Sequence, residues 1–271
     1  MTRTLPLIAS FLGLVAAQSP GTSPEVHPKL TTWKCTKAAG CVAQNTAVVL
    51  DSLSHPVHQL NNPSLGCGDW GNGPNRTVCP DAETCQKNCI MEGISDYASY
   101  GVKTKGGVLE MAQLRPDGSV TSPRLYLLAE GEKKYEWFQL TGKELTFDVD
   151  LSKLPCGMNG ALYLSEMKQD GGGNAAYGTG YCDAQCFVTP FLDGKPNIDA
   201  RGGCCNEMDI LEANAAAQQV CELPTDAMAI ADIYDRRRRT SATRPAYTLV
   251  RGTSASSTVC ATKTAVVSTL T

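Results

Sequence analysis

The chain has 271 residues, with 24 Lys and Arg against 27 Asp and Glu and a formal net charge of −3 at pH 7. This length suits one globular domain, and the near-balanced charge provides no basic field for phosphate backbones, so we expect no nucleic-acid partner. The 13 cysteines are more than a cytosolic protein usually carries, because reducing buffers there keep disulfides from persisting. The composition therefore favours a secreted, cross-linked protein.

The N-terminus resembles a secretory signal. Arg3 precedes a short apolar run at residues 5–16, and small residues come just before Gln18. We therefore expect residues 1–17 to be a cleaved signal peptide. The alternative is a membrane anchor, but this run is shorter than the about 20 apolar residues that a spanning helix needs, so we expect no membrane partner. Asn75-Arg76-Thr77 is a glycosylation sequon.

From Gln18 to about Asn214, short alternating runs are separated by Gly, Pro, Asn and Asp, which is typical of an antiparallel β protein. The clearest run is 143–151, where Leu, Phe and Val alternate with Thr and Asp. Similar runs lie at 124–128, 135–140 and 160–167. This spacing predicts a sandwich of two sheets. The one helix we expect spans 81–91, with Asp81 as its N-cap.

Residues 215–271 differ in composition from the rest of the chain. They hold one of the 25 glycines, and four consecutive arginines lie at 236–239. So abrupt a change marks a boundary. We interpret 215–271 as a separate tail, disordered or mistranslated, in preference to a nuclear or heparin-binding patch.

Four cysteines cluster near the end of the β region, namely Cys182, Cys186, Cys204 and Cys205. Four thiolates could bind zinc, but an exported chain meets oxidising conditions, so disulfides are favoured. Neighbouring residues on a strand point to opposite faces. Cys204 and Cys205 should therefore cross-link separately to the loop that carries the other two.

The segment 206–214 holds three carboxylates, Glu207, Asp209 and Glu212. On a regular strand Glu207 and Asp209 share a face and Glu212 lies on the other. The consecutive apolar residues Ile210 and Leu211 indicate a β-bulge, whose extra residue brings Glu212 back to the acidic face. We therefore expect all three carboxylates on one surface.

This spacing suits glycoside chemistry. Four effective strand steps separate the backbones of Glu207 and Glu212 by roughly 13 Å, and inward-leaning side chains can reduce the carboxyl gap to about 5 Å, the retaining separation. In such a scheme one glutamate attacks the anomeric carbon and the other serves as acid and base. Asp209, between them, would keep a proton on a neighbouring glutamate and raise its pKa, and a hydrogen bond would position the nucleophile. A solvated acidic face and a calcium site are the alternatives.

The stretch 203–214 resembles the catalytic motif of glycoside hydrolase family 7, the fungal cellulases. Further segments that resemble this family occur in the same order at 29–35, 122–127, 147–151, 154–157 and 177–186. The resemblance covers about residues 18–214.

The resemblance implies an all-β fold, a concanavalin-like β-jelly-roll sandwich of two curved antiparallel sheets with cellulose or another β-1,4-glucan in a groove. It makes Glu207 the nucleophile, Asp209 its hydrogen-bonding partner and Glu212 the acid/base. No metal or organic cofactor is expected, and the protein should be a monomer. The groove residues that it implies are Arg124, Tyr163, Tyr181, Asp183 and Gln185.

Within the family, cellobiohydrolases cover their groove with longer loops. Here the connections at 165–177 and 186–204 are short, and Leu211 stands where those enzymes usually carry Trp. We therefore expect an endoglucanase that cleaves internal bonds. A cellobiohydrolase and a non-catalytic glucan-binding module remain the alternatives.

The resemblance also implies disulfides. The pairs are Cys35–Cys41, Cys67–Cys89, Cys79–Cys85, Cys182–Cys205 and Cys186–Cys204, which leave Cys156, Cys221 and Cys260 without family partners.

Family domains continue well beyond the point where the resemblance ends, near Asn214. We therefore expect a truncated or frameshifted domain that is incomplete at its C-terminal end, with unpaired sheet edges beside the catalytic strand. Such a chain should be inactive or nearly so, because loosely held carboxylates do not keep catalytic geometry.

Overall fold

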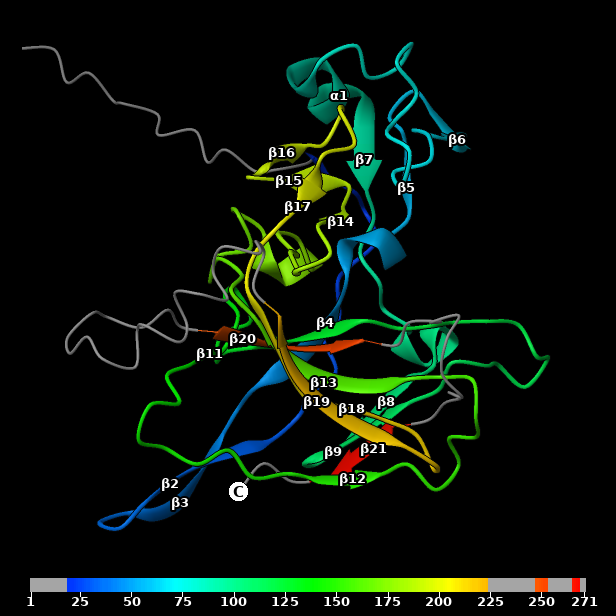
Figure 1. Cartoon of the computed structure of the whole chain (residues 1–271). Coiled ribbons are helices and arrows are strands. Elements are labelled where there is room, and N and C mark those ends of the chain that lie inside the picture. Colours follow the sequence, from blue (N-terminus) through cyan, green and yellow to red (C-terminus); the bar gives the residue numbers. More distant parts are fainter. Residues whose placement is uncertain (1–18, 224–246, 253–264, 269–271) are drawn as a thin grey trace, which may run out of the picture.

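The computed structural model of the protein describes residues 19–223, 247–252 and 265–268. The predicted signal peptide at 1–17 and the arginine run at 236–239 lie outside these residues. Within them strands predominate, and the single α-helix of the described part is α1 (Ala82–Asn88) (Figure 1). The prediction of a mostly-β protein is confirmed.

The largest sheet has seven strands and carries the predicted catalytic segment. Its order is β19-β18-β13-β20-β10-β4, and β11 pairs with β20. The strands are β4 (Ala47–Leu50), β10 (Leu125–Leu128), β11 (Trp137–Phe138), β13 (Gly160–Ser165), β18 (Glu207–Ala213), β19 (Gln218–Leu223) and β20 (Tyr247–Gly252).

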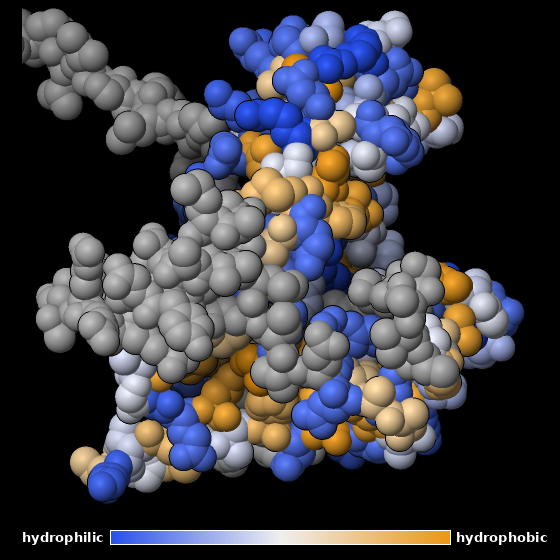
Figure 2. Space-filling model, viewed as in Figure 1, coloured by the Kyte–Doolittle hydropathy of each residue, from blue (hydrophilic) through white to orange (hydrophobic). Residues whose placement is uncertain are grey.

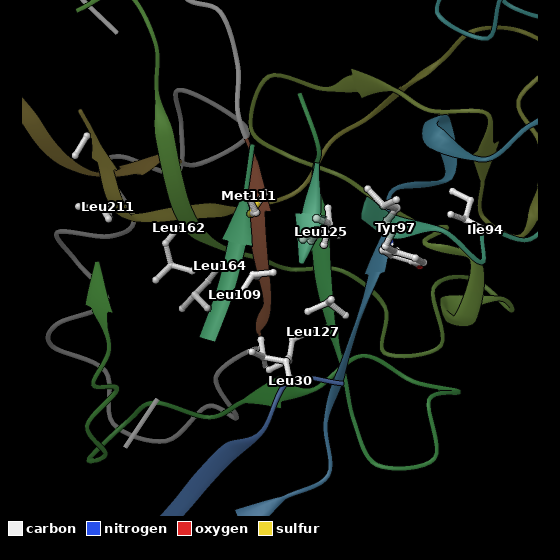
Figure 3. Packing of buried hydrophobic residues seen from close by; sticks show 14 residues of the cluster. Leu30, Ile94, Tyr97, Leu109, Met111, Leu125, Leu127, Leu162, Leu164 and Leu211 are labelled. Carbon is white, nitrogen blue, oxygen red and sulfur yellow. Dashed lines mark hydrogen bonds between the residues drawn. The ribbon is translucent and has the colours of Figure 1, made fainter. Parts of the chain in front are cut away.

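A four-stranded sheet packs against one face of the large sheet. Its order is β12-β21-β9-β8, with β8 (Val102–Lys105), β9 (Val108–Met111), β12 (Asp148–Asp150) and β21 (Ala265–Ser268). The main hydrophobic core fills the space between the two sheets: Leu109 of β9 lies with Leu125 of β10 and with Leu162 and Leu164 of β13 (Figure 3). The two sheets therefore form a sandwich.

A third sheet lies at the end of the molecule that holds α1 (Figure 1). Its order is β1-β7-β5-β6, with β1 (Ser19–Pro20), β5 (Val57–Gln59), β6 (Asn62–Gly66) and β7 (Cys89–Met91). Hydrophilic residues gather on the visible surface around α1 (Figure 2).

Short elements complete the described part. Three two-stranded sheets pair β2 (Thr32–Thr36) with β3 (Gly40–Gln44), β14 (Phe187–Val188) with β17 (Gly202–Gly203), and β15 (Phe191–Leu192) with β16 (Lys195–Pro196). The 3-10 helices are η1 (Ser52–Ser54), η2 (Tyr97–Tyr100) and η3 (Ala175–Tyr177).

The prediction of two antiparallel sheets is right for the sandwich. It is wrong for the described part as a whole, which holds further sheets. The described strands form six sheets, and β1 pairs with β7 in parallel. Of the predicted strand at 143–151, only β12 pairs, although Phe147 and Val149 do pack against the core. The predicted alternation is thus present beyond the paired residues, with half-buried apolar side chains between exposed polar ones.

The predicted helix is confirmed in kind and is shorter than expected. The Asp81 carboxylate accepts a hydrogen bond from the Thr84 amide at 2.8 Å, so Asp81 is the N-cap. The helix ends at Asn88, because Cys89 begins β7 and is tied by a disulfide to Cys67.

All five predicted disulfides are present, namely Cys35–Cys41, Cys67–Cys89, Cys79–Cys85, Cys182–Cys205 and Cys186–Cys204. These pairings exclude a zinc site of four thiolates. Cys156, for which no family partner was expected, is also disulfide-bonded. The Cys221 side chain and Cys260 lie outside the description.

The expectation of open edges beside the catalytic strand is wrong. β18 pairs with β13 on one side and with β19 on the other. β20, from the segment interpreted as a tail, lies between β13 and β10. These ladders use the backbone N–H and C=O groups that would otherwise be unpaired.

Candidate active site

The bulge predicted in β18 is present and sets the direction of the three carboxylates. Opposite β13, Leu211 pairs with Leu162 and Asp209 with Tyr163, so Ile210 is the extra residue. Met208, Ile210 and Leu211 pack against the sandwich core. Glu207, Asp209 and Glu212 therefore share the opposite face of the sheet.

These carboxyl groups differ in environment. Glu207 is 7% exposed and Asp209 4% exposed, whereas Glu212 is only partly buried. Burial, followed by the charges of Glu207 and Glu212, raises the pKa of Asp209 to about 7. Burial also raises the pKa of Glu207, with further increases from the charges of Asp183 and Glu212. In mildly acidic solution Asp209 is therefore protonated.

The sequence-based interpretation, in which a charged Asp209 keeps a proton on a neighbouring glutamate, is wrong, because the proton lies on Asp209. A side-chain hydrogen bond joins Asp209 and Glu207; it raises the pKa of Asp209 and lowers that of Glu207. This pattern means that protonated Asp209 donates to the Glu207 carboxylate. Asp209 thus supplies a hydrogen bond, and Glu207 is the ionised partner.

Glu212 has a separate neighbour. The Asn159 side-chain amide donates to Glu212 Oε1 at 2.5 Å, and Glu212 lies opposite Ala161 of β13. Nothing in the sequence pattern pointed to Asn159, which precedes β13 by one residue. Its role depends on the pairing of strands that are distant in the sequence.

A disulfide-tied loop lies against Glu207. The Ala184 amide donates to Glu207 Oε2 at 3.2 Å, and this contact opposes the rise in the pKa of Glu207. Cys182–Cys205 and Cys186–Cys204 join this loop to the residues just before β18. The backbone of Asp183 adds two hydrogen bonds, to Gly203 and Cys205. The prediction that Cys204 and Cys205 cross-link separately to this loop is confirmed.

Three of the predicted groove residues, Arg124, Tyr163 and Tyr181, lie together. The hydroxyls of Tyr163 and Tyr181 are 3.0 Å apart, and the guanidinium carbon of Arg124 lies 3.6 Å from the centre of the Tyr181 ring. Burial raises the pKa of both tyrosines. Their hydroxyls therefore keep their protons over the usual pH range and can act as donors.

A buried carboxylate that the sequence analysis missed holds Arg124 in place. Asp51 Oδ2 accepts from Arg124 Nη2 at 3.1 Å and from the Tyr126 hydroxyl, and Oδ1 accepts from the Leu53 amide at 2.7 Å. Asp51 directly follows β4, whose four residues are all buried. An acid at the end of a buried strand was the signal that could have identified it.

Gln185 is the one predicted site residue that the structure leaves apart. It is exposed on the Asp183 loop, and no hydrogen bond joins it to the other predicted site residues. Across the described ranges, the one set of adjacent metal-ligand atoms belongs to Cys79, Cys85 and Cys89, all of which are in disulfides. No helix in the described ranges is long and apolar enough to cross a bilayer.

The chain is similar in sequence to a known protein family. A family model described as "Glycosyl hydrolase family 7" matches residues 20–237. The chain is similar to endoglucanase EG-1 of Humicola insolens, with 58% identity over 226 residues that cover 81% of this chain and 52% of that protein. The chain thus spans about half the length of this curated relative. The match also extends past Asn214, where the resemblance was expected to end.

Solved structures agree with this comparison. The native endocellulase EGI of Humicola insolens has 57% identity and a TM-score of 0.72, covering 76% of this chain and 53% of that one. A cellobiohydrolase from Melanocarpus albomyces has 35% identity and a TM-score of 0.63, covering 76% of this chain and 55% of that one. The chain is therefore more similar to these endo-acting enzymes than to this cellobiohydrolase.

Proposed function

Because the chain belongs to glycosyl hydrolase family 7, we propose that it is a secreted endo-β-1,4-glucanase that cleaves internal bonds of cellulose or another β-glucan with retention. The observation that carries this proposal is the bulge of β18, which brings Glu207, Asp209 and Glu212 to one face. One strand thereby presents two glutamates with an acid between them.

Glu207 is the nucleophile in this scheme. It accepts hydrogen bonds from the Ala184 amide and from protonated Asp209, and these bonds position the attacking oxygen. Attack on the anomeric carbon forms a glycosyl ester, and Glu212 gives its proton to the leaving sugar oxygen. Glu212 then takes a proton from water, which attacks the same carbon and releases Glu207. The Asn159 amide orients Glu212 for both steps.

The groove completes the site. We propose a concanavalin-like β-jelly-roll with two curved sheets, in which a monomer binds the glucan along the carboxylate face. Arg124, Tyr163, Tyr181, Asp183 and Gln185 would bind sugar hydroxyls, without a metal ion or organic cofactor. Hydroxyl, amide and guanidinium donors beside aromatic rings are the chemistry that recognises a pyranose.

Secretion is supported by two features. The predicted signal peptide at 1–17 precedes the described part, and five cystine pairs are present within it. Disulfides of this density persist in oxidising compartments.

The test of catalysis is Glu207→Gln, which keeps the size of the side chain and removes its charge. We expect release of reducing sugar from soluble β-glucan to fall by at least about a thousandfold, while binding of the glucan is retained. A non-catalytic glucan-binding module would show equal, background release by both proteins, and this result would overturn the enzyme assignment.

Endo action is tested separately by viscosity. Cleavage inside a soluble substituted cellulose lowers viscosity early, before much reducing sugar appears. A slow decline accompanied by release of cellobiose would instead favour a cellobiohydrolase. The short connections at 165–177 and 186–204 leave little chain to cover the groove, and this favours the early decline.

A further inference from the structure

Phe187 is an exposed aromatic residue at the edge of the site. It begins β14 and is 41% exposed, whereas the aromatic residues around it, Tyr126, Tyr163 and Tyr181, are buried. Exposure of an aromatic ring leaves apolar area in water that a ligand can cover. Phe187 takes no part in the proposed reaction.

The ring of Phe187 is held by contacts with residues already placed in the site. It lies 4.6 Å from the guanidinium carbon of Arg124, on which Tyr181 also stacks. The ring centres of Phe187 and Tyr181 are 6.1 Å apart in an edge-on arrangement. Phe187 is therefore a continuation of the aromatic and cationic cluster beside the carboxylates.

The backbone of Phe187 is fixed as well. Its amide donates to Asp183 Oδ1 at 2.9 Å, and it pairs with Gly203. The preceding residue, Cys186, is cross-linked to Cys204. A ring positioned in this way before binding loses little conformational freedom when a ligand covers it.

The chemistry of the surroundings suits a sugar ring. A β-linked glucosyl unit has hydroxyls around its rim and C–H groups on its two faces, so it matches an aromatic face bordered by hydrogen-bond donors. Arg124 supplies such donors, because its guanidinium lies against the ring and 17% of its side chain is exposed. We propose that Phe187 is a stacking platform for one glucosyl unit of the β-glucan chain, and that it determines affinity for the polymer.

The platform lies beside the carboxylates and is not one of the reacting groups. From Asp209 the contacts lead through Tyr163 and Tyr181 to the Phe187 ring. From Glu207 they lead through the Ala184 amide to the loop whose Asp183 carboxylate accepts from the Phe187 amide. The Phe187 ring is therefore separated from the carboxylates by intervening residues. Its loss should weaken binding and raise KM while leaving kcat within about twofold. This inference rests on the proposed function for the identity of the ligand.

Binding is measured by calorimetry with cellotetraose in the Glu207→Gln background, so that no hydrolysis occurs. We expect Phe187→Ala to raise Kd about tenfold, in the range of a truncated aromatic contact. Phe187→Leu, which keeps an apolar side chain without an aromatic face, should bind as weakly. Phe187→Tyr should retain the parent affinity, and so should Leu114→Ala, which removes a different exposed apolar side chain.

The outcomes separate this inference from the proposed function. Equal Kd values for Phe187→Ala and its parent, or weak binding by Phe187→Tyr, would overturn the platform. Failure of the parent to bind cellotetraose would overturn both the platform and the proposed substrate. If wild-type protein fails to hydrolyse glucan but binding depends on Phe187 as described, the catalytic assignment is wrong and the platform stands.

Discussion

The carboxyl groups of β18 illustrate how environment divides roles among similar residues. Asp209 lies between two glutamates and is more buried than Glu207, so it is the group that holds a proton to about pH 7. Sequence spacing identified all three acids, because the bulge follows from two adjacent apolar residues. It did not locate the proton, which depends on burial and on charges brought together by folding.

Asp209 should make stability depend on pH. The pKa of Asp209 is raised in the fold from its ordinary value of 3.8 to about 7, so the folded state binds the proton more tightly than the unfolded chain does. The stabilisation is therefore complete below about pH 4 and is lost as the pH rises through about 7.

Asp209→Asn keeps a donor toward Glu207 and removes the titration. We expect its free energy of unfolding to fall less than that of the wild type between pH 4 and 8, as measured by denaturant titration. Parallel curves for the two proteins would contradict the assigned protonation.

Asp51 should matter for stability more than a surface acid. Asp51→Ala leaves Arg124 and Tyr126 without their buried partner, and we expect a loss of about 3 kcal/mol in the free energy of unfolding. The control is Asp199→Ala, which removes an exposed partner of Arg76 and should cost less than about 1 kcal/mol. Similar losses for the two variants would show that Asp51 does not hold Arg124.

At the scale of elements, the sequence predicted what is local and missed what is distant. The helix cap at Asp81, the alternation around Phe147 and the bulge at Ile210 all follow from neighbouring residues. Asn159 and Asp51 act through strands that are far apart in the chain, so no short pattern reveals their partners. The sheet order was equally hidden, since β20 lies between two strands that precede it by many residues.

The Cys186–Cys204 disulfide should affect catalysis through the loop that it holds. Replacing both cysteines by serine frees the segment that carries Ala184, whose amide contacts Glu207. We expect kcat to fall about tenfold or more, because the nucleophile loses a positioning hydrogen bond. The matched control replaces Cys35 and Cys41, which link the β2–β3 hairpin and should leave kcat unchanged. Equal effects of the two replacements would contradict the positioning role.

The sequon at 75–77 lies in a turn well suited to modification. Asn75, Arg76 and Thr77 are all exposed, and the Asn75 side chain accepts from the Thr77 amide at 2.9 Å. We expect a glycan on Asn75 when the chain is secreted by a fungal host. Mass spectrometry with and without an N-glycosidase measures it, and an unmodified Asn75 peptide from secreted protein would contradict this prediction.

At the scale of the molecule, the pairing of β18 bears on whether the chain folds cooperatively. The sequence-based expectation of inactivity depended on open edges beside the catalytic strand, and β13 and β19 occupy both of those edges. We therefore expect the chain from residue 18 to 271 to melt in one cooperative transition when produced in an oxidising host. A gradual, non-cooperative melt would restore the earlier expectation.

The most direct test of the account is the stereochemistry of hydrolysis. Because Glu207 is proposed to form a glycosyl ester that water then displaces, two inversions at the anomeric carbon should give net retention. Proton NMR of the first products from a soluble cellooligosaccharide, recorded before mutarotation, should show the β-anomer. The α-anomer as first product would contradict the assignment of Glu207 as nucleophile and of Glu212 as acid/base.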